Sequence, residues 1–252
     1  MLGITGTDFL SFYDWNTFSV VWRIDVLPKA VYWSESGTFV IVALEDQFYL
    51  MRYNEEEALK ALERGGVNDE GIEEAFQLLG NFKEEIINGK WITGDVFVFT
   101  NKGILNYLIG NKIINHALID KKMFILGYIP QVNRIFLINK SLKITSYELL
   151  AQTLMFQWTV VNWNPDLSLI EDIPESHWKD EFYSKIAKFL ESEGYPELAF
   201  DVTPDQEHKF ELALTLNLIE KAYEISEKAA DPKEKYWRVG DICLQSGDFD
   251  LA

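Results

Sequence analysis

The chain has 252 residues, of which 48% are apolar and 14% aromatic, and this is enough to bury one large core or two smaller ones. Its formal net charge of −17 would repel phosphate backbones and anionic lipid headgroups, which argues against nucleic-acid binding and against direct membrane adhesion. The single cysteine excludes an internal disulfide framework, which fits a reducing compartment.

The opening segment does not look like a leader. Residues 1–15 have no basic start and carry Asp8 and Asp14 among their apolar residues, so we expect no signal peptide. The longest apolar runs, 39–44 and 123–129, are far shorter than the roughly 20 residues that span a bilayer. We therefore expect no direct membrane insertion.

Short strands at regular intervals are predicted over the first 53 residues. Trp33 ends one of them, Gly37 permits a tight turn, and Asp46 closes the turn before the next strand. This order is typical of a WD-type β-propeller blade, with Tyr13-Asp14 standing where such repeats have Trp-Asp. The predicted strands are 9–14, 19–24, 29–33, 39–43 and 47–53.

A helical insert is predicted near residues 54–80. Asn54 is a good N-cap with Glu57 three residues later. Ile72, Phe76 and Leu79 fit one apolar helical stripe that ends at Gly80. We expect helix to interrupt the sheet here.

Strand patterning then returns, over 95–100, 104–108, 112–117, 123–129, 134–138 and 142–147. About a dozen strands make about three blades, whereas a closed propeller needs roughly four to eight. We expect the N-terminal half of the propeller to lie outside this sequence. An unpaired edge strand would then allow self-association with a second copy.

From about residue 148 the pattern becomes helical and more acidic. Residues 1–145 carry a net charge of −4, and residues 146–252 carry −13. Asn164-Pro165, Thr203-Pro204 and Asp231-Pro232 each place a capping side chain before proline, which predicts helix starts near 165, 204 and 232. One apolar face is formed by Trp178, Phe182, Ile186, Phe189 and Leu190, and that helix should stop at Gly194.

A weak repeat marks the helix ends. Each of three helix-terminating residues precedes a small alanine by five positions, which predicts irregular helix pairs with left-handed ends and close helix contacts at the alanines. The terminating residues are Gly194, Asn217 and Gly247, and the alanines are Ala199, Ala222 and Ala252. The predicted fold class is therefore α+β with two domains, a partial WD-type propeller over 1–147 and TPR-like pairs of an α-solenoid over 148–252.

Nothing in the sequence assembles a chemical site. The three histidines, His116, His177 and His208, fall in different predicted elements without partners at metal-ligand spacing. Cys243 lacks a neighbouring histidine that would activate it. Adjacent carboxylates such as Glu84 and Glu85 point in different directions on a helix. We expect no catalytic residue, no cofactor and no metal site.

Several strings together resemble the β′-subunit family of the COPI coatomer over essentially the whole chain. They are Phe12-Tyr-Asp-Trp15, Pro28-Lys29 with Tyr32-Trp-Ser34, Asp69-Glu-Gly-Ile-Glu-Glu-Ala-Phe76 with Leu79-Gly80, Leu126-Gly-Tyr-Ile-Pro130, Phe189-Leu-Glu191 with Gly194, and His208-Lys-Phe-Glu-Leu-Ala-Leu214. The resemblance implies the second propeller of that subunit, from its middle blades onward, followed by the first helix pairs of the solenoid.

The same resemblance implies a function and partners. It points to a non-enzymatic structural subunit of the COPI coat in retrograde Golgi-to-ER and intra-Golgi transport, cytoplasmic and peripheral on Golgi membranes and coated vesicles. It implies pairing of the solenoid with the α subunit and indirect recruitment by an Arf-type GTPase. The family's first propeller, which reads dilysine cargo tails, has no counterpart in this sequence, so cargo-tail binding is not implied.

Two other hypotheses about the function remain open at this point. One is an adaptor from another propeller-solenoid system, such as intraflagellar transport. The other is a propeller enzyme, because propellers also host active sites in their central channel.

Overall fold

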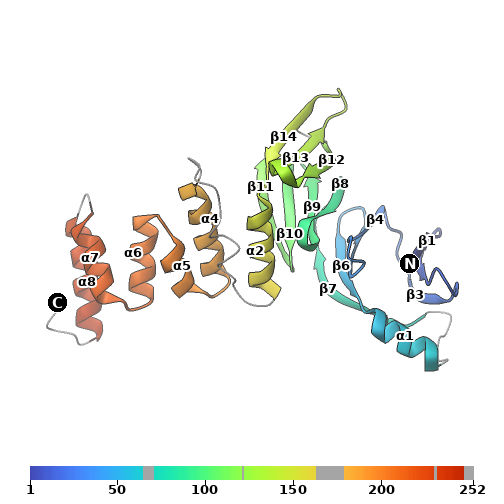
Figure 1. The fold of residues 1–252 in the computed structure, drawn as a ribbon, viewed down its shortest axis with the longest axis horizontal. Coiled ribbons are helices and arrows are strands. Elements are labelled where there is room, and N and C mark those ends of the chain that lie inside the picture. The colour runs from blue at the N-terminus through green and yellow to red at the C-terminus, as the bar shows by residue number, and fades with distance from the viewer. Residues whose placement is uncertain (65–70, 121, 163–178, 230–231, 247–252) are drawn as a thin grey trace. The chain divides into compact units, whose positions relative to one another are not determined.

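The computed structural model describes residues 1–64, 71–120, 122–162, 179–229 and 232–246 (Figure 1). The chain divides into two compact units, Met1–Trp158 and Thr159–Ala252. The first unit is built mainly of β-sheets and the second, in its described part, of helices. The predicted class, a partial propeller followed by helix pairs, is confirmed.

In the described part of the first unit, fourteen strands form four antiparallel sheets, each made of consecutive strands. Sheet A contains β1 (Leu2–Thr5), β2 (Leu10–Tyr13) and β3 (Val20–Ile24), and sheet B contains β4 (Ala30–Trp33), β5 (Phe39–Ala43), β6 (Phe48–Tyr53) and β7 (Phe76–Phe82). Sheet C contains β8 (Asn88–Ile92), β9 (Val96–Asn101), β10 (Ile104–Ile109) and β11 (Lys112–Leu118). Sheet D contains β12 (Phe124–Ile129), β13 (Arg134–Ile138) and β14 (Ile144–Glu148).

The number of sheets differs from the expected three blades. Strands β1, β7 and β8 were not predicted, and they raise the total from about a dozen to fourteen. Sheets B and C have the four strands of a complete blade, whereas sheets A and D have three each. The partial propeller therefore consists of two complete blades flanked by two three-stranded sheets.

The insert between β6 and β7 is shorter than predicted. Helix α1 (Glu55–Arg64) begins as expected, because the Asn54 side-chain oxygen accepts a 3.3 Å hydrogen bond from the Glu57 amide. The helical stripe through Ile72, Phe76 and Leu79 is wrong, since Phe76 starts strand β7 opposite Tyr53. Such a short apolar run fits both helical and strand spacing, and packing of the Phe76 ring decides between them.

The core of the first unit lies between neighbouring sheets. Sheets A and B share one apolar cluster, in which the Phe76 ring stacks on Phe12 and Trp22 with centroids 5.1 and 4.9 Å apart. Sheets B and C share a second cluster that includes Phe48 and Phe97. Face-to-face contact of successive sheets is the packing of propeller blades.

Sheet D continues this packing, and helix α2 (Ala151–Asn162) follows it. Thr100 of β9 donates a 2.9 Å hydrogen bond to the Met123 carbonyl beside β12. On α2, the Gln157 side chain accepts a buried 3.0 Å hydrogen bond from the Tyr107 hydroxyl of β10. Burial raises the pKa of Tyr107 to about 12, so it remains a donor at neutral pH.

The described helices of the second unit follow one another with short connections. They are α4 (Lys179–Ser192), α5 (Pro196–Val202), α6 (Gln206–Thr215), α7 (Ile219–Glu227) and α8 (Pro232–Ser246). The predicted start at 232 is confirmed, and the one near 165 lies outside the described residues.

The start predicted near 204 needs a correction. Asp205 is the N-cap of α6, because its carboxylate accepts from the amides of Glu207 and His208. The Thr203 side chain instead contacts the His208 ring, so Thr203 ends α5 and does not cap α6.

Candidate interaction surfaces

The turn after Trp33 has the local geometry of a WD-type blade. Gly37 adopts a left-handed φ of 72°, and its amide donates a 3.0 Å hydrogen bond to the Ser34 carbonyl. The Trp33 ring packs edge-on against Phe12, with centroids 5.3 Å apart. Asp46 is exposed in the turn between β5 and β6. Trp33 and Gly37 therefore have packing and turn roles.

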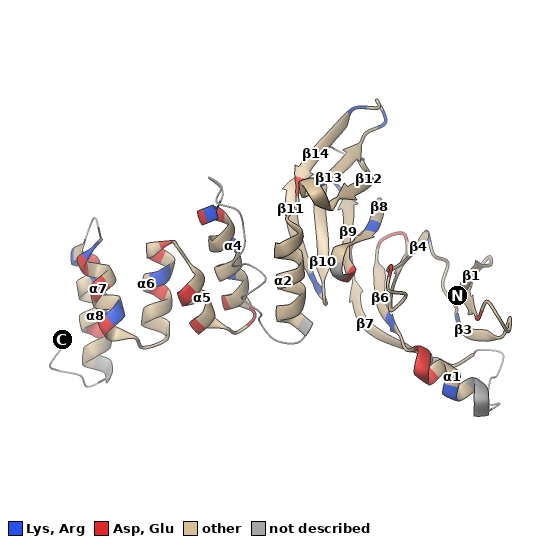
Figure 2. Ribbon diagram, in the orientation of Figure 1, with Lys and Arg blue, Asp and Glu red and all other residues tan. Residues whose placement is uncertain are grey.

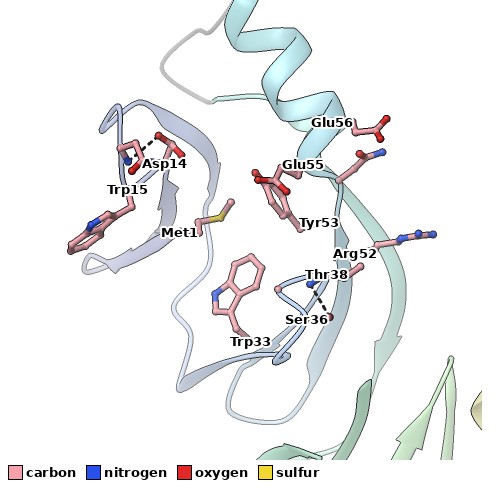
Figure 3. Close-up of a pocket in the computed structure, with 13 residues that line it drawn as sticks. Met1, Asp14, Trp15, Trp33, Ser36, Thr38, Arg52, Tyr53, Glu55 and Glu56 are labelled. Atoms are coloured by element: carbon pink, nitrogen blue, oxygen red, sulfur yellow. Dashed lines mark hydrogen bonds between the residues drawn. The ribbon is translucent and has the colours of Figure 1, made fainter. Parts of the chain in front are cut away.

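An open hollow of about 880 Å³ lies beside Trp33, between loops of sheets A and B (Figure 3). Trp33 and Tyr53 contribute aromatic rings to its wall, and Asp14, Glu55 and Glu56 contribute carboxylates. Neither histidine nor cysteine lines the hollow. The wall therefore offers aromatic and acidic contacts, without an imidazole or thiol that could act as base or nucleophile.

The acidic groups of this hollow stabilise the local structure of the chain. The Asp14 carboxylate accepts hydrogen bonds from the Thr17 amide at 2.7 Å and the Thr17 hydroxyl at 2.8 Å, which lower the pKa of Asp14. Glu55 and Glu56 lie in the first turn of α1, where they interact favourably with the helix dipole. These roles account for the carboxylates without a ligand.

Two of the predicted helix-terminating residues close their helices in the same way. Gly194 and Asn217 have left-handed φ values of 89° and 56°. After Gly194 the Tyr195 amide donates to the Leu190 carbonyl at 2.9 Å, and after Asn217 the Leu218 amide donates to the Ala213 carbonyl at 2.8 Å. Both patterns are Schellman motifs. Gly247 lies outside the described residues.

The two interior alanines of the repeat are fully buried. Ala199 of α5 and Ala222 of α7 each have 0% exposure. Ser226, one turn after Ala222, is also fully buried and donates its hydroxyl to the Ala222 carbonyl at 2.8 Å. Small side chains on this face of α7 leave little room for a larger residue. Ala252 lies outside the described residues.

Ion pairs join α6 and α8. The Arg238 guanidinium donates to both carboxylate oxygens of Glu211 at 2.5 and 2.7 Å, which lowers the pKa of Glu211. Lys235 donates to Glu207 at 2.5 Å. Both cations also lie over the buried Phe210 ring, 5.1 and 5.3 Å from its centroid. We call these five residues the α6–α8 seam; sequence analysis did not find it.

The α4–α6 contact contains His208. Its Nε2 lies 2.9 Å from the Glu191 carboxylate, and its Nδ1 lies 3.2 Å from the Thr203 hydroxyl. His116 is elsewhere, with Nε2 2.7 Å from the Glu148 carbonyl. His177 lies outside the described residues, and Cys243 is buried. His116 and His208 thus each have hydrogen-bond partners within their own unit.

Acidic positions recur along the described helices of the second unit (Figure 2). Glu220, Glu224 and Glu227 are exposed along α7 at helical spacing. In contrast, Lys209 and Lys221 lie over the Phe200 ring, 5.0 and 4.9 Å from its centroid. Basic side chains are thus used partly in contacts between helices, and the outer surface of α7 is acidic.

The described residues contain no group of three or more His, Cys, Asp or Glu side chains placed to hold a metal ion. Among those same residues, no helix combines the length and the apolar character needed to cross a bilayer.

The fold and these surfaces define a class. A partial propeller followed by helix pairs with acidic outer faces is a propeller-solenoid protein, a class that works through extended contact surfaces. Family models support this division of the chain: "COPA/B second beta-propeller" matches residues 1–139, and "COPA/B TPR domain" matches residues 165–252. The chain belongs to the COPA/B family.

Its relatives include coatomer subunits. Coatomer subunit beta' of Homo sapiens and of Rattus norvegicus are each 36% identical over 254 residues, which cover 100% of this chain and 28% of the relative. Coatomer subunit beta'-1 of Oryza sativa subsp. japonica is 34% identical with the same coverage. The chain thus spans about 28% of the length of these relatives. Among solved structures, the Dos1 propeller aligns over 56% of this chain and 35% of that chain, with TM-score 0.39 and 14% identity.

Proposed function

We propose that this chain acts within a structural subunit of the COPI vesicle coat, in retrograde Golgi-to-ER and intra-Golgi transport. The observation that carries the proposal is the succession of two COPA/B domains, propeller then TPR, along a chain 36% identical throughout to coatomer subunit beta'. Both the order and the full coverage of this chain agree with that assignment.

The proposed mechanism is geometric and non-enzymatic. Helix pairs held together by buried small residues and by the α6–α8 seam give a firm arm with a long outer surface. We propose that this arm contacts the α subunit of the coat. Many weak contacts of this kind add up through multivalency when subunits assemble into a lattice.

Recruitment to the membrane would come from elsewhere in the coat. Residues 146–252, which include the whole second unit, carry a net charge of −13, and such an acidic segment is repelled by anionic headgroups. We propose that an Arf-type GTPase recruits the coat, and that this chain stays cytoplasmic and peripheral on Golgi membranes.

The test is direct binding of purified partners. The 252-residue chain is mixed with the purified α subunit and complex formation is measured by sedimentation and by calorimetry. We expect a stoichiometric complex that weakens with salt. Lack of a complex would overturn the α-subunit contact, and selective binding to a ciliary transport complex would favour the adaptor alternative.

A second experiment tests the location. The fluorescently tagged chain is imaged in cells before and after Arf activation is blocked. We expect Golgi-associated fluorescence that disperses when Arf is inactive. A diffuse signal under both conditions would contradict recruitment through the coat.

A further inference from the structure

Sheet D differs in charge from the rest of the chain. Residues 121–147, which hold its strands except for the last residue of β14, contain five Lys or Arg and no Asp or Glu. The whole chain, in contrast, has 23 basic and 40 acidic residues. Exposed charges more than about 8–10 Å apart are largely screened at physiological salt, so the acidic total does not describe the local potential of this sheet.

Two of these lysines flank an exposed leucine in the loop that joins β13 to β14. Residues 139–143 form this loop, which we call the sheet D loop, and Figure 2 shows basic positions along it. Leu142 is 77% exposed and stands in sequence between Lys140 and Lys143, which are themselves exposed. Lys122 is exposed at the same end of the sheet, since β12 begins two residues later, opposite the last residue of β13.

Hydrogen bonds fix the sheet D loop in one shape. The Asn139 side-chain oxygen accepts from the Ser141 amide at 3.0 Å, from the Ser141 hydroxyl at 2.7 Å and from the Lys143 amide at 3.0 Å. The Leu142 amide also donates to the Asn139 carbonyl at 3.0 Å. Leu142 has a left-handed φ of 61°, a conformation that favours glycine or asparagine. Turn geometry therefore does not explain a leucine at this position.

We propose that the sheet D loop contacts an anionic bilayer surface, with Leu142 among the headgroups and Lys140, Lys143 and Lys122 beside the lipid phosphates. A leucine presented together with lysines matches the combination of apolar burial and charge attraction that binds peripheral segments to anionic membranes. Lysine stems can lie along the apolar boundary while their ammonium groups stay in water.

The chemistry of the loop favours lipid over an acidic protein. All three charges belong to lysines, which act as point charges, whereas arginine is the residue that recognises carboxylates in a fixed bidentate geometry. A fluid lipid surface also accepts an exposed leucine without a preformed pocket. The proposal uses the loop and not the outer face of sheet D, where Arg134 and Glu148 lie in register at the opposite end of the strands.

One such loop binds weakly by itself. A single apolar anchor gives marginal, reversible attachment, and stable anchoring needs further signals. The contact therefore orients a chain that other proteins have already brought to the membrane, and repetition within an assembly multiplies it. The inference does not depend on the proposed role in a vesicle coat.

Co-sedimentation with vesicles tests the proposal on the full 252-residue chain. Vesicles of phosphatidylcholine alone are compared with vesicles that also contain phosphatidylserine, at low and at physiological salt. We expect binding to the anionic vesicles only, and weaker binding as salt rises. Lys140→Glu combined with Lys143→Glu should weaken this binding at least about tenfold, and Leu142→Asn should also weaken it.

Matched controls separate the loop from total charge. Lys188→Glu combined with Lys228→Glu changes the net charge equally, at two exposed lysines of the second unit, and should leave vesicle binding nearly unchanged. Leu27→Asn, at a site 62% exposed between β3 and β4, is the control for the leucine. Equal losses in the loop variants and in their controls would overturn the proposal, as would a wild-type chain that binds neither kind of vesicle. Far-UV circular dichroism verifies that the variants are folded.

A dye at the loop gives a second readout. The native cysteine, Cys243, is buried, so Leu142→Cys can be labelled with a polarity-sensitive fluorophore. Its emission should shift to shorter wavelength with anionic vesicles, whereas the same dye at Leu27→Cys should not respond. Vesicle binding without a shift at position 142 would contradict the proposal. Binding of the loop to soluble polyglutamate, with no binding to vesicles, would also overturn it and assign the loop to an acidic protein.

Discussion

The indole N–H of Trp91 in β8 donates a 2.9 Å hydrogen bond to the backbone carbonyl of Tyr32 in β4. These two strands each stand at one end of their sheets, so the bond ties sheet B to sheet C. Trp91 is only 6% exposed, and its ring also stacks on the Phe39 ring of β5 in sheet B, with centroids 6.2 Å apart. One side chain therefore supplies both polar and apolar contact between two blades.

Replacing Trp91 with phenylalanine should weaken the propeller. The change keeps a ring but removes the donor, and a partly buried carbonyl that loses its partner costs up to about 1–3 kcal/mol. We expect the free energy of unfolding to fall by that amount in urea denaturation. Trp237→Phe, at a site 76% exposed, should change it little. Equal effects of the two changes would contradict a special role for the Trp91 bond.

Gly194 and Gly240 should respond to alanine in opposite directions. Gly194 has a left-handed φ of 89°, where an L-residue costs about 1–2 kcal/mol. Gly240 lies inside α8, and an added Cβ there meets nothing within 4 Å, so alanine should stabilise by about 0.5–1 kcal/mol. Chemical denaturation measures both. If Gly194→Ala were neutral, the left-handed helix end would be disproved.

Ala222→Leu should separate neighbouring helices. The site has 0% exposure, and overpacking a close-packed position costs about 1–3 kcal/mol. Because units of a solenoid contact mainly their neighbours, the propeller should keep its own stability. The measurements are urea denaturation and binding to the α subunit. We expect both the free energy of unfolding and the affinity for the α subunit to fall. Glu224→Leu, on the exposed side of the same helix, is the control. If Ala222→Leu left both stability and partner binding unchanged, the site would not be packed.

The α6–α8 seam should make the solenoid sensitive to acid. Arg238 holds the pKa of Glu211 below its ordinary value of 4.5. A carboxylate with a lowered pKa adds stability above its unfolded value, and that stability is lost as the pH falls through the folded pKa. Since the Glu211 side chain is 52% exposed, the effect should be no more than about 1 kcal/mol.

Thermal unfolding followed between neutral pH and pH values below 4.5 measures this effect. Glu211→Gln should be less stable than the wild type at neutral pH, and the difference should shrink in acid. Glu181→Gln, which removes an exposed pair with Lys185 on α4, is the comparison. If the difference in thermal stability between the wild type and Glu211→Gln did not change with pH, the α6–α8 seam would not be its source.

Local signals in the sequence predicted local structure well. The Gly37 turn, the Asn54 cap and the start of α8 at Pro232 depend on a few neighbouring residues, and the structure contains them. Strand β8 was missed because Asn88, Gly89 and Lys90 do not alternate like a half-buried strand. A Cβ on Gly89 would lie 2.2 Å from the Phe97 ring, so the glycine there makes room for a core side chain.

Contacts between distant residues were not predictable in the same way. Glu211 and Arg238 are 27 positions apart, and each looks in the sequence like part of a solvated helical face. They meet because Arg238 of α8 reaches across to α6, where it also lies over the Phe210 ring. Phe76 was misassigned for a similar reason, since its partners Phe12 and Trp22 belong to another sheet.

The assembly of each sheet from consecutive strands has a consequence for how the chain folds during synthesis. Sheet B is complete once β7 has been made, and none of its strands pairs with a strand outside it among the described residues. Each sheet can therefore form as it leaves the ribosome, without waiting for a distant partner. Such short-range pairing favours fast folding.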